Sequence, residues 1–202
     1  MKRLLFVFLS LFLPLCAASA SAAAFSPLQI GINVGHCTQL VDEHTPVFGL
    51  RLNLPLSGND YVRGLDIGLL SCADYFTGLR LNAFSWTART LYGVEISPCG
   101  MARHLNGIHV CGIGVVTREL CGLQVGLVPC AANANGLQIG LFDMSENVYG
   151  VQIGFVNHTL SLHGLQIGLV NYARSLHGLQ IGLVNIVPES SIPCLPLLRA
   201  SF

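Results

Sequence analysis

An eight-residue motif recurs at an almost constant interval along most of this 202-residue chain. The sequence GLQIGLVN begins at Gly164 and again at Gly178, and close variants begin at Gly150, Gly136 and Gly122. Weaker copies begin upstream at Gly107, Gly93, Gly78, Gly64 and Gly49. Successive copies start 14 or 15 residues apart, and the two intervals alternate before Gly122. Ten copies from Gly49 to about Val187 are too regular for chance, and they indicate a repeat architecture.

Within each copy, hydrophobicity alternates with a period of two. If the first glycine is position one, then positions two, four and six are usually Leu, Ile and Leu, and position three is usually polar. Position five is often a second glycine. This period predicts an extended strand with one apolar face, because an amphipathic helix would need apolar spacings of three and four. Turn-forming residues follow, as in segments 143–147 and 171–175. Each copy is therefore predicted to be a strand of about nine residues and a turn of about five.

Two further segments extend the series. Residues 27–34 resemble the repeat with Pro27 in place of the first glycine, and proline is tolerated at the start of a strand. Residues 195–202 are predicted to form a last strand. With the ten copies, these segments predict a single all-β domain of about 12 strands over residues 25–202.

The residues at position three are the candidate structural row. In chain order they are Arg51, Asp66, Arg80, Glu95, His109, Gln124, Gln138, Gln152, Gln166 and Gln180. The charge alternates in sign over the first four, and opposite charges on neighbouring strands stabilise a sheet. We therefore expect a continuous row in which consecutive copies are spatial neighbours. The alternative is that these residues only mark a solvent-exposed face.

Two architectures bring the row into register. The favoured prediction is an antiparallel meander that closes into a barrel, because alternating intervals suit turns that alternate between two ends of a sheet. The alternative is a β-solenoid of 14-residue coils stacked in parallel, with Leu, Ile and Leu inside. In a solenoid His163 and His177 would stack and could share a metal ion, whereas in a meander they would lie at opposite ends.

A closed barrel with strands of this length would suit the outer membrane. A strand of about nine residues rises about 30 Å, or about 21 Å when tilted, which approaches the apolar band of an outer-membrane barrel. The Leu-Ile-Leu face would then contact lipid, and the structural row would line the interior.

The N-terminus has the features of a secretory signal. Lys2 and Arg3 precede an apolar run over residues 4–15, and small residues at 18–22 offer cleavage sites. Residues 1–22 are therefore predicted to be a signal peptide, with an uncleaved anchor or a lipoprotein at Cys16 as alternatives.

Seven of the eight cysteines lie outside this segment, so an odd number reaches the exported chain. No C-x-x-C motif is present, which gives no support to a zinc or thioredoxin-like site. Cys99 and Cys111 flank the segment 102–105 and could form a disulfide across a hairpin.

Composition bears on the kind of partner. The formal net charge is zero, which argues against nucleic-acid binding. With 52% hydrophobic and 10% charged residues, an apolar surface is expected. Asp42, Glu43 and His44 share the one long loop, but three polar residues in a loop are ordinary. No catalytic, cofactor-binding or metal site is predicted, and the chain is expected not to be an enzyme.

The tandem octapeptide, the Phe48–Leu54 segment, the Arg63–Gly68 copy and the closing Ser191–Leu197 segment carry a resemblance. The chain resembles uncharacterised bacterial surface-repeat proteins built on GLQIGLVN, over about Ser26 to Phe202. The resemblance implies export and a cell-envelope location, and it supplies no catalytic residues. The chain departs from the pattern in its many cysteines and in degenerate copies between Gly93 and Cys121.

These observations predict a non-enzymatic exported cell-envelope protein, associated with a membrane as an outer-membrane or surface barrel with a structural, contact or minor pore role. The alternative is a soluble β-solenoid, secreted or periplasmic, that acts as a binding surface. The sequence does not identify a protein or small-molecule partner.

Overall fold

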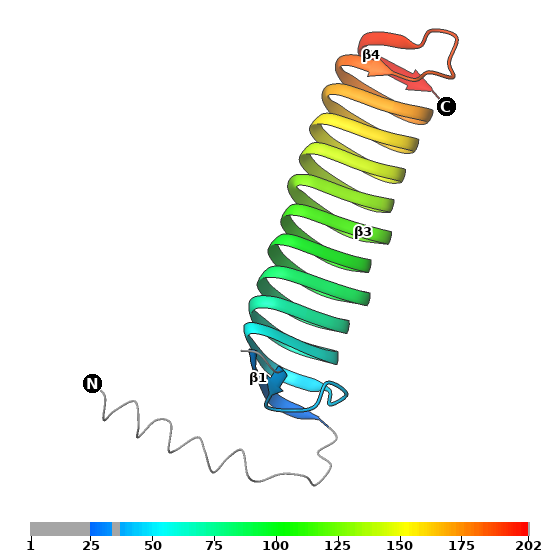
Figure 1. Ribbon diagram of the computed structural model, residues 1–202. Coiled ribbons are helices and arrows are strands. Elements are labelled where there is room, and N and C mark those ends of the chain that lie inside the picture. The colour runs from blue at the N-terminus through cyan, green and yellow to red at the C-terminus, as the bar shows by residue number, and fades with distance from the viewer. Residues whose placement is uncertain (1–24, 34–36, 202) are drawn as a thin grey trace, which may run out of the picture.

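A computed structural model describes residues 25–33 and 37–201, and over these residues the chain is almost entirely β. The elements are β1 (Ser26–Asn33), β2 (Cys37–Gln39), β3 (Val47–Ile186) and β4 (Cys194–Ser201). The all-β prediction is confirmed. β3 winds as a stack of coils, each coil corresponding to one copy of the repeat (Figure 1). The predicted signal peptide, residues 1–22, lies outside the described residues.

A column of glycines holds successive coils in register. The first glycine of a copy has a positive φ, for example 145° at Gly164 and 148° at Gly178. A Cβ on Gly178 would lie 2.0 Å from the carbonyl oxygen of Gly164, and a Cβ on Gly164 equally close to that of Gly150. Only glycine combines this backbone angle with this close approach. The same contact begins at Gly49, which lies against the carbonyl of Pro27, so Pro27 takes the place of a first glycine.

Burial divides each coil into three straight segments. In the copy that begins at Gly164, the inward side chains are Gln166, Asn171, Ala173 and Leu176. Two successive outward residues at 169–170 and again at 174–175 break the alternation, and each pair marks a corner. The glycine column forms the third corner. The coil is therefore three-sided, and its interior receives positions three, five, eight, ten and thirteen.

The predicted antiparallel meander closing into a barrel is wrong. The sheet is not closed, successive copies follow one another as coils, and β1 pairs in parallel with the start of β3, with Gln29 opposite Arg51 (Figure 1). The alternative of a β-solenoid with 14-residue coils describes this arrangement. The predicted count of about 12 strands is not resolved, because pairing between coils continues through the corners and β3 runs over 140 residues.

The alternating intervals do not report strand direction, because the extra residue of a 15-residue copy is absorbed at a corner. In a 14-residue copy, two outward residues separate Ala173 from Leu176, whereas three separate Thr87 from Leu91 and three separate Val116 from Leu120. In the first copy the extra residue lies between Asn53 and Ser57. A corner can therefore lengthen without disturbing the inward rows, and alternating intervals carry no information about strand direction.

Antiparallel strands cover both ends of the solenoid. At the N-terminal end β2 pairs with β1, with Gly31 opposite Gln39. At the C-terminal end β4 pairs with the last coil, with Arg199 opposite Gln180. β4 is the predicted last strand, and Pro196 within it limits further pairing at this edge. Such end coverage protects the terminal coils of a repeat stack from water.

None of the described residues belongs to a helix long and apolar enough to cross a membrane.

Candidate functional site

The structural row lies inside the coil rather than on a solvent-exposed face. All ten position-three side chains are at most 1% exposed. Gln29 of β1 and Arg199 of β4, which pair with Arg51 and Gln180, extend the same row to both ends of the solenoid. Buried polar groups are costly unless they are hydrogen-bonded, so the internal partners of this row decide whether the fold is stable.

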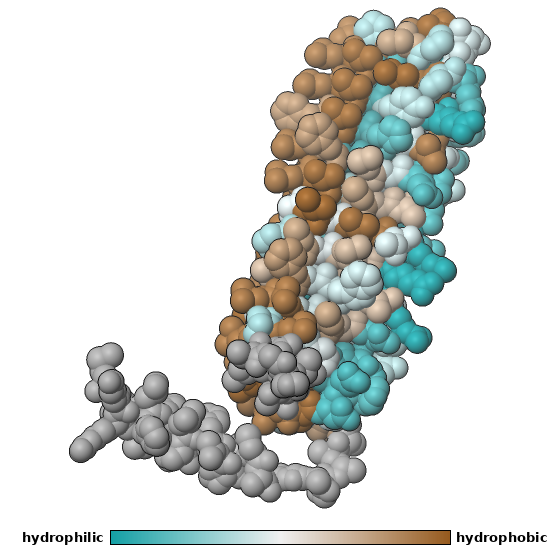
Figure 2. Space-filling model, viewed as in Figure 1, coloured by the Kyte–Doolittle hydropathy of each residue, from teal (hydrophilic) through white to brown (hydrophobic). Residues whose placement is uncertain are grey.

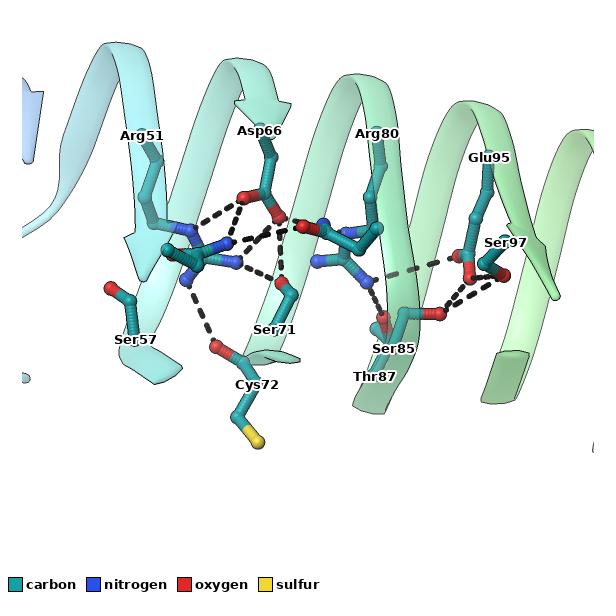
Figure 3. Close-up of polar contacts among 12 residues, drawn as sticks. Arg51, Ser57, Asp66, Ser71, Cys72, Arg80, Ser85, Thr87, Glu95 and Ser97 are labelled. Carbon is teal, nitrogen blue, oxygen red and sulfur yellow. Dashed lines mark hydrogen bonds and ion pairs between the residues drawn. The ribbon is translucent and has the colours of Figure 1, made fainter. Parts of the chain in front are cut away.

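The N-terminal part of the row is a chain of alternating charges (Figure 3). Arg51 donates from Nε to Asp66 Oδ1 at 3.1 Å and from Nη2 to Asp66 Oδ2 at 2.6 Å. Arg80 donates from Nε to the same Asp66 Oδ2 at 3.0 Å. Asn53 and Ser71 also donate to this carboxylate, at 2.6 and 2.7 Å. Asp66 is thus held between two guanidinium groups from the coils on either side.

The row continues from Arg80 into a less complete arrangement. Arg80 Nη1 donates to Thr87 Oγ1 at 2.7 Å and lies 3.8 Å from Glu95 Oε2. The guanidinium also lies 4.1 Å from the centre of the Phe76 ring, a cation–π contact. Ser85 and Ser97 both donate to Glu95 Oε1. The two arginines and two carboxylates cancel, so this buried stretch carries no net charge.

The electrostatics of Asp66 reflect a balance between burial and its partners. Burial alone would raise the pKa of this carboxyl, but the neighbouring Arg51 and Arg80 and the donated hydrogen bonds together lower it. A lowered pKa means that ionised Asp66 stabilises the fold at neutral pH. That contribution is lost as the pH falls through the lowered pKa.

His109 marks the end of the charged stretch. Its Nε2 lies 3.8 Å from Glu95 Oε1, and neither ring nitrogen has a hydrogen-bond partner within the described part of the chain. Burial lowers the pKa of this imidazole, with Arg80 acting in the same direction and Glu95 opposing. The neutral ring therefore separates the ionic stretch from the amides that follow.

The C-terminal part of the row is a ladder of glutamine amides. In each step, Nε2 of one glutamine donates to Oε1 of the glutamine in the preceding coil. The distances are 3.1 Å from Gln138 to Gln124, 2.9 Å from Gln152 to Gln138, 2.7 Å from Gln166 to Gln152 and 2.8 Å from Gln180 to Gln166. Gln124 ends the ladder by donating to the carbonyl of Gly114. Every step links adjacent coils, so the ladder specifies their register.

A second inward row at position eight was missed from the sequence. Asn157 Nδ2 donates to Asn171 Oδ1 at 2.7 Å, and Asn171 Nδ2 donates to Asn185 Oδ1 at 2.8 Å. The invariant Asn at the end of GLQIGLVN and GVQIGFVN was the signal that could have revealed it. The glycine at position five makes room for these amides, since a Cβ on Gly182 would lie 2.5 Å from Asn171 Nδ2.

Asp143 occupies position eight one coil before this asparagine ladder. Among the described residues, neither of its carboxyl oxygens nor Asn157 Oδ1 has a hydrogen-bond partner. Both residues face the same small space, because a Cβ on Gly154 would lie 2.8 Å from Asp143 Oδ2 and 3.0 Å from Asn157 Oδ1. Burial raises the pKa of Asp143 to about 7. A protonated Asp143 can donate to Asn157 Oδ1, whereas an ionised one cannot.

The opposite inner wall is apolar. Position thirteen, two residues before each first glycine, carries residues that include Phe76, Leu91, Leu105, Leu120 and Leu162, all fully buried. Small residues such as Ala102, Ala131 and Ala173 fill position ten beside them. These rows form the hydrophobic core of the solenoid, in contact with the aliphatic parts of the polar rows.

The Leu-Ile-Leu positions point outward, which corrects the solenoid alternative as it was predicted. We refer to positions two, four and six of all copies as the apolar face. Its members include Leu69, Ile153, Leu169 and Leu183, which are 51%, 37%, 45% and 61% exposed. They point outward because the side chains at positions three, eight, ten and thirteen already fill the interior of the coil. Figure 2 shows the hydrophobic surface gathered along one side of the solenoid and hydrophilic residues along the other.

The apolar face is grooved. Between the position-four and position-six side chains runs a channel with a volume of about 600 Å³ over the last coils. Its floor is the glycine backbone at position five, and its walls include Ile153, Ile167, Phe155 and Leu169. Position five faces the interior, so no side chain stands between positions four and six on the outside.

Rings flank the apolar face. At position fourteen Tyr149, His163 and His177 stack with centroids 4.8 Å apart, so the two histidines lie together as the solenoid alternative predicted. On the neighbouring side, His158 stacks on Tyr172 at 4.7 Å, and Trp86 is 53% exposed. No group of three or more His, Cys, Asp or Glu side chains within residues 25–33 and 37–201 is arranged to hold a metal ion.

The cysteine prediction does not agree with the structure. Cys99 and Cys111 are both free thiols. They belong to consecutive parallel coils at positions seven and five, not to the two arms of a hairpin. Cys111 points inward and its Sγ donates to the carbonyl of Val125, and burial raises the pKa of this thiol to about 12.

The loop with Asp42, Glu43 and His44 is exposed. His44 Nδ1 lies 2.8 Å from Asp60 Oδ2, and this hydrogen bond is the main cause that raises the pKa of the imidazole. The contact ties the loop to the first coil and forms no enclosed site.

Comparison of the chain with protein-family models, curated proteins and solved structures found no match.

The first prediction concerns the buried ion chain. Asp66→Asn removes the carboxylate that pairs with Arg51 and one of the two carboxylates near Arg80. We therefore expect a loss of about 3–5 kcal/mol of stability, seen as a lower melting temperature by circular dichroism. Glu189→Asn is the control, because Glu189 pairs with Arg174 on the surface at 2.7 Å and should cost less than about 1 kcal/mol. Equal effects of the two substitutions would contradict the buried arrangement.

The second prediction concerns Asp143. Its raised pKa means that the folded state holds a proton up to about pH 7, which the unfolded chain releases near pH 4. Stability from this group therefore falls as the pH rises from about 4 to about 7. Asp143→Asn removes the penalty and supplies a donor for Asn157 Oδ1, so the variant should melt higher than the wild type at pH 8.

The difference in melting temperature should shrink towards pH 4, where wild-type Asp143 is protonated. Asp74→Asn, at a surface ion pair with Arg89, provides the control. A pH-independent difference for Asp143→Asn would show that ionisation of Asp143 is not the cause.

Proposed function

We propose that the chain is an exported, non-enzymatic cell-envelope protein that attaches to a lipid surface through its apolar face. The observation that carries this proposal is that the Leu-Ile-Leu side chains lie outside a core that other residues fill. These side chains are not needed inside the fold, and an apolar surface of this extent on a soluble protein is typical of a site of interaction.

The composition of the face favours lipid. In none of the ten copies does position two, four or six carry a polar or charged side chain. An interface with a different, transiently bound protein is usually about as polar as the rest of the surface, whereas hydrocarbon favours an uninterrupted apolar surface.

The aromatic rings beside the apolar face also favour a solenoid that lies with this face on lipid. Tyrosine, tryptophan and histidine have an apolar body and a polar edge, and they suit the boundary between hydrocarbon and water. Tyr149 and Tyr92 lie on one flank of the apolar face, and Trp86 and Tyr172 lie on the neighbouring side. They would sit at headgroup level when the face rests on the acyl chains.

The side away from the apolar face is suited to water. It carries surface ion pairs between Asp74 and Arg89 and between Arg174 and Glu189. Asn147 also donates to Asn133 across adjacent coils, at 2.9 Å. The solenoid is therefore amphipathic around its circumference, as a protein lying in the plane of an interface must be.

Export and a non-enzymatic role belong to the proposal. The signal-like N-terminus and the resemblance to surface-repeat proteins favour an envelope location, at the outer membrane or cell surface. The ionisable groups of the structural row are at most 1% exposed and bind one another, so they offer no surface for a substrate. Peripheral attachment replaces the earlier expectation of a membrane-spanning barrel or minor pore.

The third prediction tests lipid attachment. The purified protein should float with phosphatidylcholine vesicles in a density gradient at physiological salt. Leu169→Lys places a charge on the apolar face and should lower the affinity for vesicles by about tenfold, measured as the bound fraction over a series of lipid concentrations. One exposed leucine contributes about 1.4 kcal/mol or more when it is buried.

Leu160→Lys is the matched control. Leu160 is 44% exposed, against 45% for Leu169, but it lies at position eleven on the polar side. It should leave flotation unchanged. Failure of the wild type to float, or equal loss in both variants, would contradict attachment through the apolar face.

A further inference from the structure

We propose that, away from lipid, two copies of this chain cover each other's apolar faces and form a face-to-face homodimer. The proposal goes beyond the proposed function, because it concerns the form of the protein in water. Exposure of the apolar face to water is unfavourable in free energy, so this face must be covered or must attract other apolar surfaces.

The size of the face matches what a stable dimer requires. Ten coils about 4.8 Å apart give a length of about 48 Å, and positions two to six with their side chains span about 17 Å. The face therefore offers about 800 Å² per copy, which is the amount each partner buries in a standard stable interface. The largest apolar patch on a typical monomer is about 300–600 Å², so an uncovered face would be unusually large.

The shape of the face is complementary to itself. Over the last coils the position-four and position-six side chains form two ridges, and the channel of about 600 Å³ lies between them. A ridge such as Ile153 and Ile167 on one copy can enter the channel of the other, over the glycine floor of Gly154 and Gly168. Both copies use the same patch, which is the requirement for a closed two-fold dimer.

The electrostatics do not oppose this contact. Because positions two, four and six lack charged side chains in every copy, two identical faces meet without repulsion and without burying an unpaired charge. The surface ion pairs between Asp74 and Arg89 and between Arg174 and Glu189 lie away from the contact and remain in water. The interface resembles two sheets packed face to face, at about 10 Å between their backbones.

The test is the mass of the full purified protein in detergent-free buffer at micromolar concentrations, by sedimentation velocity. The expected result is a dimer, with a dimer fraction that decreases on dilution. Ile153→Lys, in the wall of the channel, should shift the protein to monomer, whereas Leu160→Lys on the polar side should leave it dimeric. A far-ultraviolet circular dichroism spectrum shows that each variant retains its β structure.

A monomeric wild type, or a dimer that survives Ile153→Lys and dissociates with Leu160→Lys, would overturn the proposal. A flotation experiment with phosphatidylcholine vesicles on the same protein distinguishes the homodimer from lipid attachment. A monomer that floats contradicts the dimer and leaves lipid attachment intact. A dimer that does not float supports the dimer and contradicts lipid attachment.

Discussion

The small interior of a 14-residue coil is the constraint on which the rest of this structure depends. Three straight segments enclose room for one glutamine, one asparagine or serine, one small residue and one large apolar residue per turn, as Gln166, Asn171, Ala173 and Leu176 show. Protein interiors are close-packed, so no space remains for a further leucine or isoleucine. The Leu-Ile-Leu side chains must therefore point outward, and the apolar face follows from the circumference of the coil.

The same constraint makes polar side chains useful in the interior. A glutamine amide carries both a donor and an acceptor, so identical residues in consecutive coils can bond in a continuous ladder, as Gln138, Gln152 and Gln166 do. The ladder penalises any slip between coils, because a slipped amide would be buried without a partner. Where the row is charged, Asp66 between Arg51 and Arg80 performs the same role with alternating signs. Hydrogen bonds between the inward polar side chains thus specify the register of the coils. The buried apolar residues at position thirteen supply the hydrophobic stabilisation.

The sequence predicted the local structure and the neighbours but not the architecture. The period of two identified an extended chain with one apolar face, and the alternation from Arg51 to Glu95 correctly suggested that consecutive copies are adjacent. Both features hold for a meander and for a solenoid, since each places every copy beside the next. The direction of each copy depends on whether the corners reverse the chain, and the absorbed extra residue near Arg89 shows that the spacing does not report this. Asn157 and its equivalents were missed because their inward direction becomes apparent only once the corners are known.

The fold depends on position three facing the interior and position four facing outward. Gln152 and Ile153 are adjacent in sequence, and they are 0% and 37% exposed. The most direct measurement compares the thermal unfolding of Gln152→Lys and Ile153→Lys by circular dichroism. We expect lysine at 152 to abolish or strongly destabilise the fold, because its charge is buried without a partner. Lysine at 153, measured at a protein concentration low enough for the wild type to be monomeric, should change stability by about 1 kcal/mol or less. A folded, stable Gln152→Lys together with an unfolded Ile153→Lys would show that the coil is built with its apolar residues inside.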